Sequence, residues 1–355
     1  MEEHPLKQIG EFGLIDRILS WFGAETTDLE GAGDDCTVLK RNGDSVDLVT
    51  TDLLIEETHF LFEKITPYQL GHKALAVNLS DIAAMGGRPK NVWLSIGLTT
   101  RADLNWLEDF FSGMKDLAHK YGVKLMGGDT TRSQNHLVIN IMVTGEAAPD
   151  RVKFRSSARP DDIIFVTDPV GDSGGGLQLL LEGDLYTTDP DEQKLITAHN
   201  LPWPCVDEGV WLGQQPAVHA LIDVSDGISS DAGHIANRSG VAMNIELSAL
   251  PISSELRRVA RKRNWDPVQL ACSAGEDYVL MGTCAPAEWD TLSVQYRNVF
   301  DSDLHAVGTV RKVSGDGKKT HEKSAGLLRG GEVRFTRNGE PAEPGRPGFD
   351  HFRSA

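Results

Sequence analysis

The chain has 355 residues, of which 40% are hydrophobic and 25% are charged. It is long enough for two domains of ordinary size, and its composition is that of a folded protein rather than a disordered one. The formal net charge of −17 argues against nonspecific binding to nucleic acid or to an anionic membrane, because both require basic patches. An anionic substrate stays compatible with this charge, since carboxylates can hold divalent cations that in turn hold phosphates.

The sequence predicts a cytoplasmic protein. No stretch approaches the ~18–20 uninterrupted apolar residues of a membrane helix. The first residues, MEEHPLKQIG, lack the basic region and apolar run of a secretory signal. Cys36, Cys205, Cys272 and Cys284 form no C-x-x-C pair and match no standard zinc spacing, so we expect reduced thiols in or near a core.

Helical and strand patterns alternate along the chain, which predicts an α/β or α+β fold. Residues 66–86 are predicted to form a helix that begins at Thr66 and Pro67 and ends at Gly86. Residues 91–99 alternate between apolar and other side chains, as in a strand. Residues 103–121 are predicted to form a second helix, with an apolar stripe of Leu104, Leu107, Phe111, Met114, Leu117 and Tyr121.

Two further strands are predicted at 137–145 and 163–167, with a polar stretch between them. This stretch suggests a domain boundary near residue 149, giving domains of 1–148 and 149–355. The segment 311–348 is rich in Gly, Lys, Arg, Ser and Pro, and we expect one or two strands with loops there.

Aspartates recur where apolar runs stop, and each of them alone has an ordinary explanation as a turn residue or a helix N-cap. They are Asp34, Asp35, Asp52, Asp81, Asp129, Asp223 and Asp226. Asp81 differs from the rest because its helix is otherwise almost wholly apolar. We expect it at a core edge or in a cleft, with a salt-bridge partner as the alternative to a metal. If several of these carboxylates converge, they form an oxygen-rich site of the kind that Mg²⁺ prefers.

The usual nucleotide motifs are missing: there is no P-loop and no protein-kinase signature. GDSGGG at 171–176 is compatible equally with a phosphate-facing loop and with a tight strand-to-helix turn. Ser225 has no evident His partner for a hydrolase triad, and a lone His59 is more often structural than catalytic. Lys73 is as compatible with the surface as with a functional site.

A series of distinctive stretches runs along nearly the whole chain. In order, they are GEFGLIDRI, GAGDDCTVL, TTDLLIEETHF, KALAVNLSDIAAMGG, LMGGDTTRS, RSSARPDDIIFVTDPVGDSGGGL, LIDVSDGISSDAGHIA, SAGEDY and GFDHF. In these stretches and their order, the chain resembles the thiamine-monophosphate kinase family. NLSDIAAMGG and GGDTT are shared with the broader superfamily of aminoimidazole ribonucleotide synthetase, selenophosphate synthetase and hydrogenase-maturation proteins. The start of the chain, IDVSDG, GEDY and the GFDHF ending favour the thiamine enzymes.

The resemblance implies a two-domain synthetase-like fold with a mixed N-terminal sheet that pairs across a homodimer. It implies transfer of the γ-phosphoryl group of ATP to thiamine monophosphate, with several Mg²⁺ ions, no general base and no phosphoenzyme, and it leaves a requirement for K⁺ open. The implied metal ligands are Asp35, Thr50, Asp52, Asp81, Asp129, Asp223 and Asp226. The implied ATP contacts are Thr51, Gly128, Asp129, Arg155 and Ser225, and the implied substrate contacts are His59, Glu276 and Phe349.

Two other hypotheses remain at this point. Another ATP-dependent enzyme of the same superfamily, such as an amidine-forming cyclase, would share the carboxylates but use a different acceptor. A non-catalytic protein that binds a nucleotide or thiamine phosphate has no need for so many charges held together. Turnover of ATP separates these two hypotheses.

Overall fold

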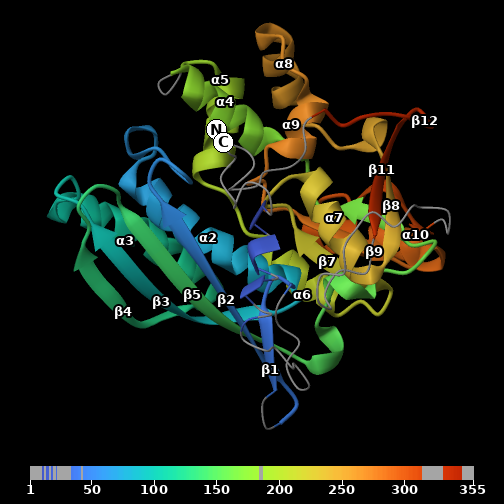
Figure 1. The fold of residues 1–355 in the computed structure, drawn as a ribbon, viewed down its shortest axis with the longest axis horizontal. Coiled ribbons are helices and arrows are strands. Elements are labelled where there is room, and N and C mark those ends of the chain that lie inside the picture. The colour runs from blue at the N-terminus through green and yellow to red at the C-terminus, as the bar shows by residue number, and fades with distance from the viewer. Residues whose placement is uncertain are drawn as a thin grey trace.

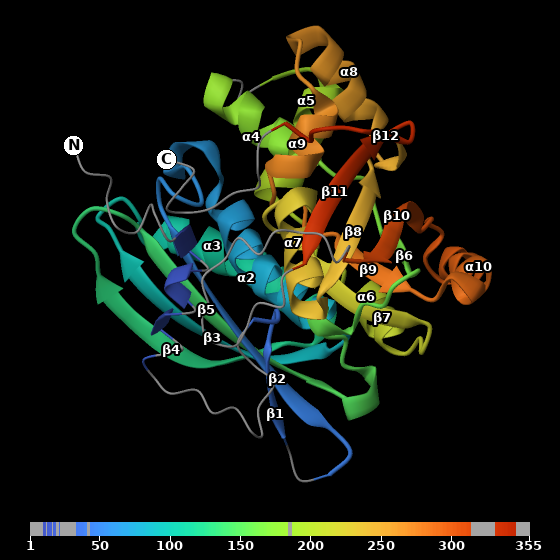
Figure 2. The same ribbon diagram turned by 45° about the vertical axis from the view of Figure 1, so that its right-hand side comes forward.

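The computed structural model describes residues 33–40, 43–183, 187–313 and 331–345, together with parts of 10–21. Within these residues the strands form two sheets, with helices packed between and around them (Figures 1 and 2). The α/β architecture expected from the alternating pattern is confirmed.

In the described part of the chain, five strands form the first sheet in the order β1-β2-β5-β3-β4. They are β1 (Thr37–Lys40), β2 (Val46–Ile55), β5 (Val138–Ala147), β3 (Arg88–Leu98) and β4 (Lys124–Arg132). Only the β3–β4 pair is parallel among these pairings, so the sheet is mixed, as expected. Strand β4 lies at one edge, and all nine of its residues are exposed.

Two helices, α2 (Pro67–Ala84) and α3 (Leu104–Tyr121), cover one face of this sheet (Figure 1). Helix α2 begins with a capping box, in which Thr66 and Gln69 each accept a hydrogen bond from the other's backbone N–H. Helix α2 also packs on α6 and β7 of the second half of the chain. Helix α2 therefore contacts strands of both sheets.

The predicted apolar stripe of α3 is partly wrong. Leu104 is 78% exposed, and the buried face is centred on Phe110, Met114 and Leu117 instead. Two glycines explain this orientation, because a Cβ at Gly113 would lie 1.9 Å from the carbonyl oxygen of Tyr68 on α2, and Gly71 meets α3 in the same way. The close helix crossing fixes which face of α3 turns inward.

Within the described residues, seven strands form the second sheet in the order β12-β11-β8-β10-β6-β9-β7. They are β6 (Ile163–Val166), β7 (Val218–Asp223), β8 (Val241–Glu246), β9 (Leu280–Cys284), β10 (His305–Lys312), β11 (Glu332–Arg337) and β12 (Glu340–Pro341). The helices of this half are α4 (Asp172–Glu182), α5 (Pro190–Asn200), α6 (Val206–Gly213), α7 (Ile228–Ser239), α8 (Ser254–Arg263), α9 (Pro267–Ser273) and α10 (Trp289–Phe300). Short 3-10 helices lie at Phe62–Lys64, Pro149–Arg151, Arg155–Ser157, Leu247–Ala249 and Pro286–Glu288.

The Gly-rich segment 171–176 forms the start of α4, with Gly171 as the N-cap, at the end of the connection from β6. Gly171 has a φ of 92°, which a residue with a Cβ rarely adopts. The backbone N–H groups of Gly171 and Ser173 donate to the carboxylate of Asp277, at 2.6 and 3.1 Å. A Cβ at Gly176 would lie 2.1 Å from the carbonyl oxygen of Leu195 on α5. These contacts favour the strand-to-helix turn over the phosphate-facing loop.

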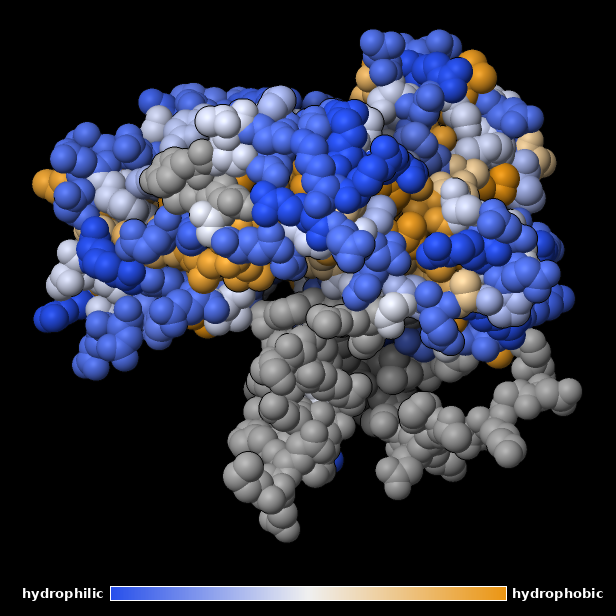
Figure 3. All heavy atoms as spheres, turned by 90° about the horizontal axis from the view of Figure 1, so that it is seen from above, coloured by the Kyte–Doolittle hydropathy of each residue, from blue (hydrophilic) through white to orange (hydrophobic). Residues whose placement is uncertain are grey.

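The four cysteines are free and buried, as expected. None of the helices in the described ranges has the length and apolarity needed to cross a membrane. Seen from above, hydrophilic side chains cover most of the described surface, with smaller apolar groups between them (Figure 3).

Candidate active site

Three aspartates from distant parts of the chain meet where α2 lies against both sheets. Asp35 precedes β1, Asp81 lies in the last turns of α2, and Asp223 ends β7. Each offers a carboxylate oxygen, and these oxygens all lie within 4.8 Å of one another. The side chain of Asp35 is fully buried, and Asp223 is 1% exposed. Convergence of the predicted carboxylates therefore holds for these three.

Each of the three carboxylates is oriented by a neighbour. The hydroxyl of Thr50 donates to Asp81, and the hydroxyl of Ser80 donates to Asp223 at 2.6 Å. Arg155 donates to both oxygens of Asp35, from Nε at 3.1 Å and from its Nη2 at 2.5 Å. A two-point contact between a guanidinium and a carboxylate fixes direction as well as distance. Thr50 and Arg155, both predicted site residues, are thus part of this cluster.

The electrostatics of the cluster favour the binding of a cation. Burial raises the pKa of Asp81 well above its ordinary value, and repulsion from Asp52, Asp223 and Asp35 adds to it. Burial and repulsion from Asp35 likewise raise the pKa of Asp223, and they bring that of Asp52 to about 6. Buried like charges are unfavourable unless a cation compensates them. The donor set consists of carboxylate and hydroxyl oxygens, which suits Mg²⁺.

Asp52 lies in the middle of β2 rather than after it, which corrects the expectation that it follows a strand. Its backbone N–H donates to the side-chain oxygen of Asn78 on α2 at 3.1 Å. The neighbouring Thr51 is exposed, and its hydroxyl accepts a hydrogen bond from Asn140 at 3.0 Å. Helix α2 thus supports β2 at Asp52 as well as supplying Asp81.

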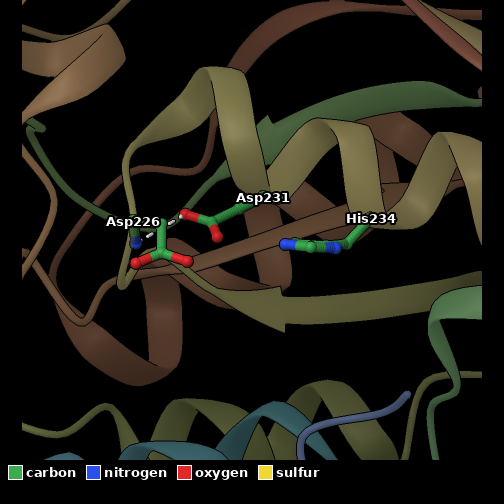
Figure 4. Close-up of side chains that lie close together, drawn as sticks. All are labelled: Asp226, Asp231 and His234. Carbon is green, nitrogen blue, oxygen red and sulfur yellow. Dashed lines mark hydrogen bonds between the residues drawn. The ribbon is translucent and has the colours of Figure 1, made fainter. Parts of the chain in front are cut away.

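A second group of possible ligands contains Asp226, Asp231 and His234 (Figure 4). Asp226 lies just before α7, and the other two residues are three positions apart on that helix, so they share one face. The backbone N–H of Asp226 donates to Asp231 at 3.2 Å. Burial raises the pKa of Asp231 well above its ordinary value, and burial together with the charge of Arg155 lowers that of His234 to about 3. A neutral imidazole beside two carboxylates is a suitable set of metal ligands.

Gly128 and Asp129 do not join either group within one chain. Both lie on the exposed edge strand β4, and β5 and β3 separate β4 from the strand that carries Asp52. Three strand spacings correspond to about 14 Å, which is too far for a shared ion. Asp129 lies inside β4, where it follows Leu125, Met126 and two glycines.

Of the three predicted substrate residues, the described structure includes Glu276 and His59. Glu276 lies in the loop before β9, where its carboxylate contacts the ammonium group of Lys73 at 3.1 Å. His59 accepts a hydrogen bond on Nδ1 from the backbone of Ile55, at 3.0 Å, and its charge acts on Glu276. Phe349 lies outside the described residues.

The loop that carries Glu276 packs closely on the loop that carries Ser225. The backbone N–H of Glu276 donates to the carbonyl oxygen of Ser225 at 2.8 Å. A Cβ at Gly275 would lie 2.3 Å from the same oxygen. Ser225 and Glu276 are thereby held side by side.

Sequence reasoning did not single out Ser80, Asp231 or His234 as site residues, and it left Lys73 undecided. The spacing of Asp231 and His234 on a helix directly after Asp226 is a signal that could have found that pair. Ser80 and Lys73 carry no such signal, because their roles depend on partners 143 and 203 positions away.

Comparisons with known proteins agree with this fold. The family described as AIR synthase related protein, N-terminal domain, matches residues 33–147, and the corresponding C-terminal domain matches residues 159–314. A thiamine-monophosphate kinase of Haemophilus influenzae is 34% identical, covering 98% of this chain and 99% of its own length. The enzyme of Escherichia coli K12 is 36% identical over 97% of this chain and 98% of its own.

Solved structures give the same result. AaThiL complexed with AMPPCP and TMP matches with a TM-score of 0.82 and 30% identity, covering 99% of this chain and all of that one. The thiamine-monophosphate kinase of Stenotrophomonas maltophilia K279a matches with a TM-score of 0.73 and 33% identity, covering 94% of this chain and 98% of that one. The resemblance noted in the sequence is confirmed: the chain belongs to the AIR synthase-related family and, within it, to the thiamine-monophosphate kinases.

Proposed function

We propose that this protein transfers the γ-phosphoryl group of ATP directly to the phosphate of thiamine monophosphate, giving thiamine diphosphate and ADP. The observation that carries the proposal is the group of Asp35, Asp81 and Asp223, whose carboxylate oxygens all lie within 4.8 Å of one another. Such a group is costly to fold unless it binds a hard divalent ion. The family relatives named above support the choice of acceptor.

We assign roles to the predicted residues as follows. Mg²⁺ would be held by Asp35, Thr50, Asp52, Asp81, Asp129, Asp223 and Asp226; ATP would contact Thr51, Gly128, Asp129, Arg155 and Ser225; thiamine monophosphate would contact His59, Glu276 and Phe349. A need for K⁺ stays open. Asp231 and His234 are added as ligands beside Asp226 because their ligand atoms converge with it.

The acceptor phosphate is already anionic near neutral pH, since its second pKa is about 6. The reaction therefore needs no general base, and the barrier is the repulsion between two anionic phosphates. Bound Mg²⁺ supplies the positive charge that offsets this repulsion. The chain's own part is to hold the ligands in place: Arg155 fixes Asp35, Ser80 fixes Asp223, and Thr50 fixes Asp81.

We also propose a homodimer formed through the edge of the first sheet. Strand β4 exposes all nine residues, including Leu125 and Met126, each 56% exposed. An unpaired edge strand with apolar side chains readily pairs with another chain. A second copy at this edge would cover these side chains. It would also let Asp129 of one copy contribute to the site of the other, which it cannot reach within its own chain. The domains 1–148 and 149–355 and a cytoplasmic location belong to the same proposal.

The proposal is tested by incubating the purified protein with ATP, Mg²⁺ and thiamine monophosphate and following thiamine diphosphate by chromatography. Free thiamine serves as a parallel acceptor. Product from the monophosphate alone is expected. If ATP binds in a magnesium-dependent way but this product does not form, the acceptor is not thiamine monophosphate but that of another enzyme of the superfamily.

Direct transfer has a separate test. With ATP made chiral at the γ-phosphorus, one in-line displacement inverts the configuration, whereas a phosphoenzyme gives two displacements and net retention. We expect inversion, and retention would contradict direct transfer.

A further inference from the structure

Lys73 is a fully buried ammonium group on α2, the helix that also carries Asp81. Its residue is 0% exposed, and its Nζ lies 3.1 Å from one oxygen of Glu276 and 3.2 Å from the other. Glu276 comes from the second half of the chain, so this ion pair links the two halves. Burying an ammonium group without a carboxylate partner costs several kcal/mol of folding free energy. The folded state of this chain therefore depends on the pairing of Lys73 with Glu276.

Glu276 is only partly buried. Its side chain is 24% exposed, whereas Lys73 has 1% of its side chain exposed. His199 places its Nδ1 3.3 Å from the same carboxylate and 3.0 Å from the hydroxyl of Ser173. Burial and the charge of Lys73 lower the pKa of His199 to about 4, so its ring is neutral near pH 7. Among the described residues, Lys73 therefore supplies the full positive charge in direct contact with this carboxylate.

The backbone of Glu276 is held in an unusual conformation. Glu276 and Tyr278 have φ values of 57° and 53°, a region that residues with a side chain seldom adopt. Such strain costs on the order of 1 kcal/mol per residue and persists where the surroundings hold it. Here the N–H of Tyr278 donates to the carbonyl of Val224 at 2.9 Å, and the carboxylate of Asp277 caps α4. The loop thus presents the Glu276 carboxylate from a fixed position.

We propose that Lys73 is a positioning residue that holds the carboxylate of Glu276 toward the acceptor, so that its open side recognises the cationic thiazolium ring of thiamine monophosphate. This rests on the proposed function for the identity of the acceptor. Lys73 itself cannot touch the substrate because it is buried. Since Lys73 and Asp81 are eight residues apart on α2, about 12 Å along its axis, one rigid helix sets the spacing between acceptor recognition and the metal cluster.

A purely structural ion pair between the two halves of the chain is the alternative, and the charge of the ligand distinguishes the two. The probe is the monophosphate of deazathiamine, in which a neutral thiophene replaces the thiazolium ring. Binding of both ligands is measured by calorimetry for the wild type, Lys73→Met, Glu276→Gln and the double variant. Lys115→Met, on the exposed face of α3, is the matched control.

We expect the wild type and Lys115→Met to bind thiamine monophosphate ~10–100-fold more tightly than the neutral analogue, as for loss of one partner of a charge pair. Lys73→Met and Glu276→Gln should lose most of this preference, with binding of ATP changed less than ~3-fold, and the double variant should behave like either single one. If Lys73→Met does not fold, Glu276→Gln and the double variant still report the preference.

Two results would overturn the proposal. One is a wild type that binds both ligands equally well. The other is a Lys73→Met protein that keeps the preference for thiamine monophosphate, or that binds both ligands more weakly by the same factor. Calorimetry needs no turnover, so these results are separate from the chromatographic test of the reaction: a failed phosphoryl transfer alone would overturn the proposed function but not the recognition of the ring.

Discussion

Replacing Asp52 by Asn is expected to stabilise the metal-free protein while it impairs the enzyme. Burial, with repulsion from Asp35, raises the pKa of Asp52 from 3.8 to about 6. The folded state therefore keeps the proton to higher pH than the unfolded state does. The free energy of unfolding falls as the pH rises from about 4 to about 6, and the loss is complete above that range.

The size of this effect follows from the shift. About two pKa units, at about 1.4 kcal/mol each, give about 3 kcal/mol as an upper bound. Asn carries no charge, and the backbone hydrogen bond from position 52 to Asn78 is kept. Above about pH 7 and with a chelator present, we therefore expect Asp52→Asn to be more stable than the wild type by up to about 3 kcal/mol.

The assay is urea unfolding followed by tryptophan fluorescence, with chelator and with millimolar Mg²⁺, on either side of the expected pKa. Asp44→Asn is the control, because Asp44 is exposed and lies two residues before β2. Mg²⁺ should stabilise the wild type and the control more than Asp52→Asn, since a ligand that binds only the folded state raises its stability. An Asp52→Asn protein that is less stable in chelator, or that gains as much from Mg²⁺ as the wild type, would refute this reasoning.

Four further predictions concern other parts of the molecule. Asp81→Asn should lower kcat by ~10²–10³ with the fold retained, and a loss below ~10-fold in steady-state assays would count against a metal role. Asp277→Ala should destabilise the protein by about 1–2 kcal/mol in urea unfolding, because Asp277 caps α4; unchanged stability would show that water replaces this cap. Gly128→Ala should unfold or strongly destabilise the protein, because its Cβ would lie 1.7 Å from a carbonyl oxygen of β3. The control Gly122→Ala has open space around it and should cost about 1 kcal/mol. Equal melting temperatures for the two variants would contradict the close approach of β4 to β3. Leu125→Glu should convert a dimer into a monomer in sedimentation velocity, and a dimer that persists would place the interface elsewhere.

The local features of the fold could be predicted from the sequence because their causes are local. The start of α2 follows from Thr66, Pro67 and Gln69, all within one helical turn. The buried face of α3 could not be predicted, because it is set by a close crossing with α2 at Gly71 and Gly113 rather than by the apolar stripe alone.

The candidate site, too, could be predicted only in part from the sequence. Aspartates after glycines and strands gave the candidates, and three of them converge. Their place in the secondary structure could not be predicted in the same way, because Asp52 and Asp129 lie inside strands. Lys73 could not be judged from its neighbours in sequence, because its partner Glu276 is brought to it only by the packing of the two halves.

The central claim is that the buried aspartates bind the magnesium on which phosphoryl transfer depends. The most direct measurement is the rate of thiamine diphosphate formation from ATP and thiamine monophosphate as Mg²⁺ is titrated into chelator-treated protein. We predict no product without the metal, a rise with Mg²⁺, and a rise displaced to much higher Mg²⁺ in Asp223→Asn. Product formation in chelator, or the same Mg²⁺ dependence in the variant, would contradict the claim.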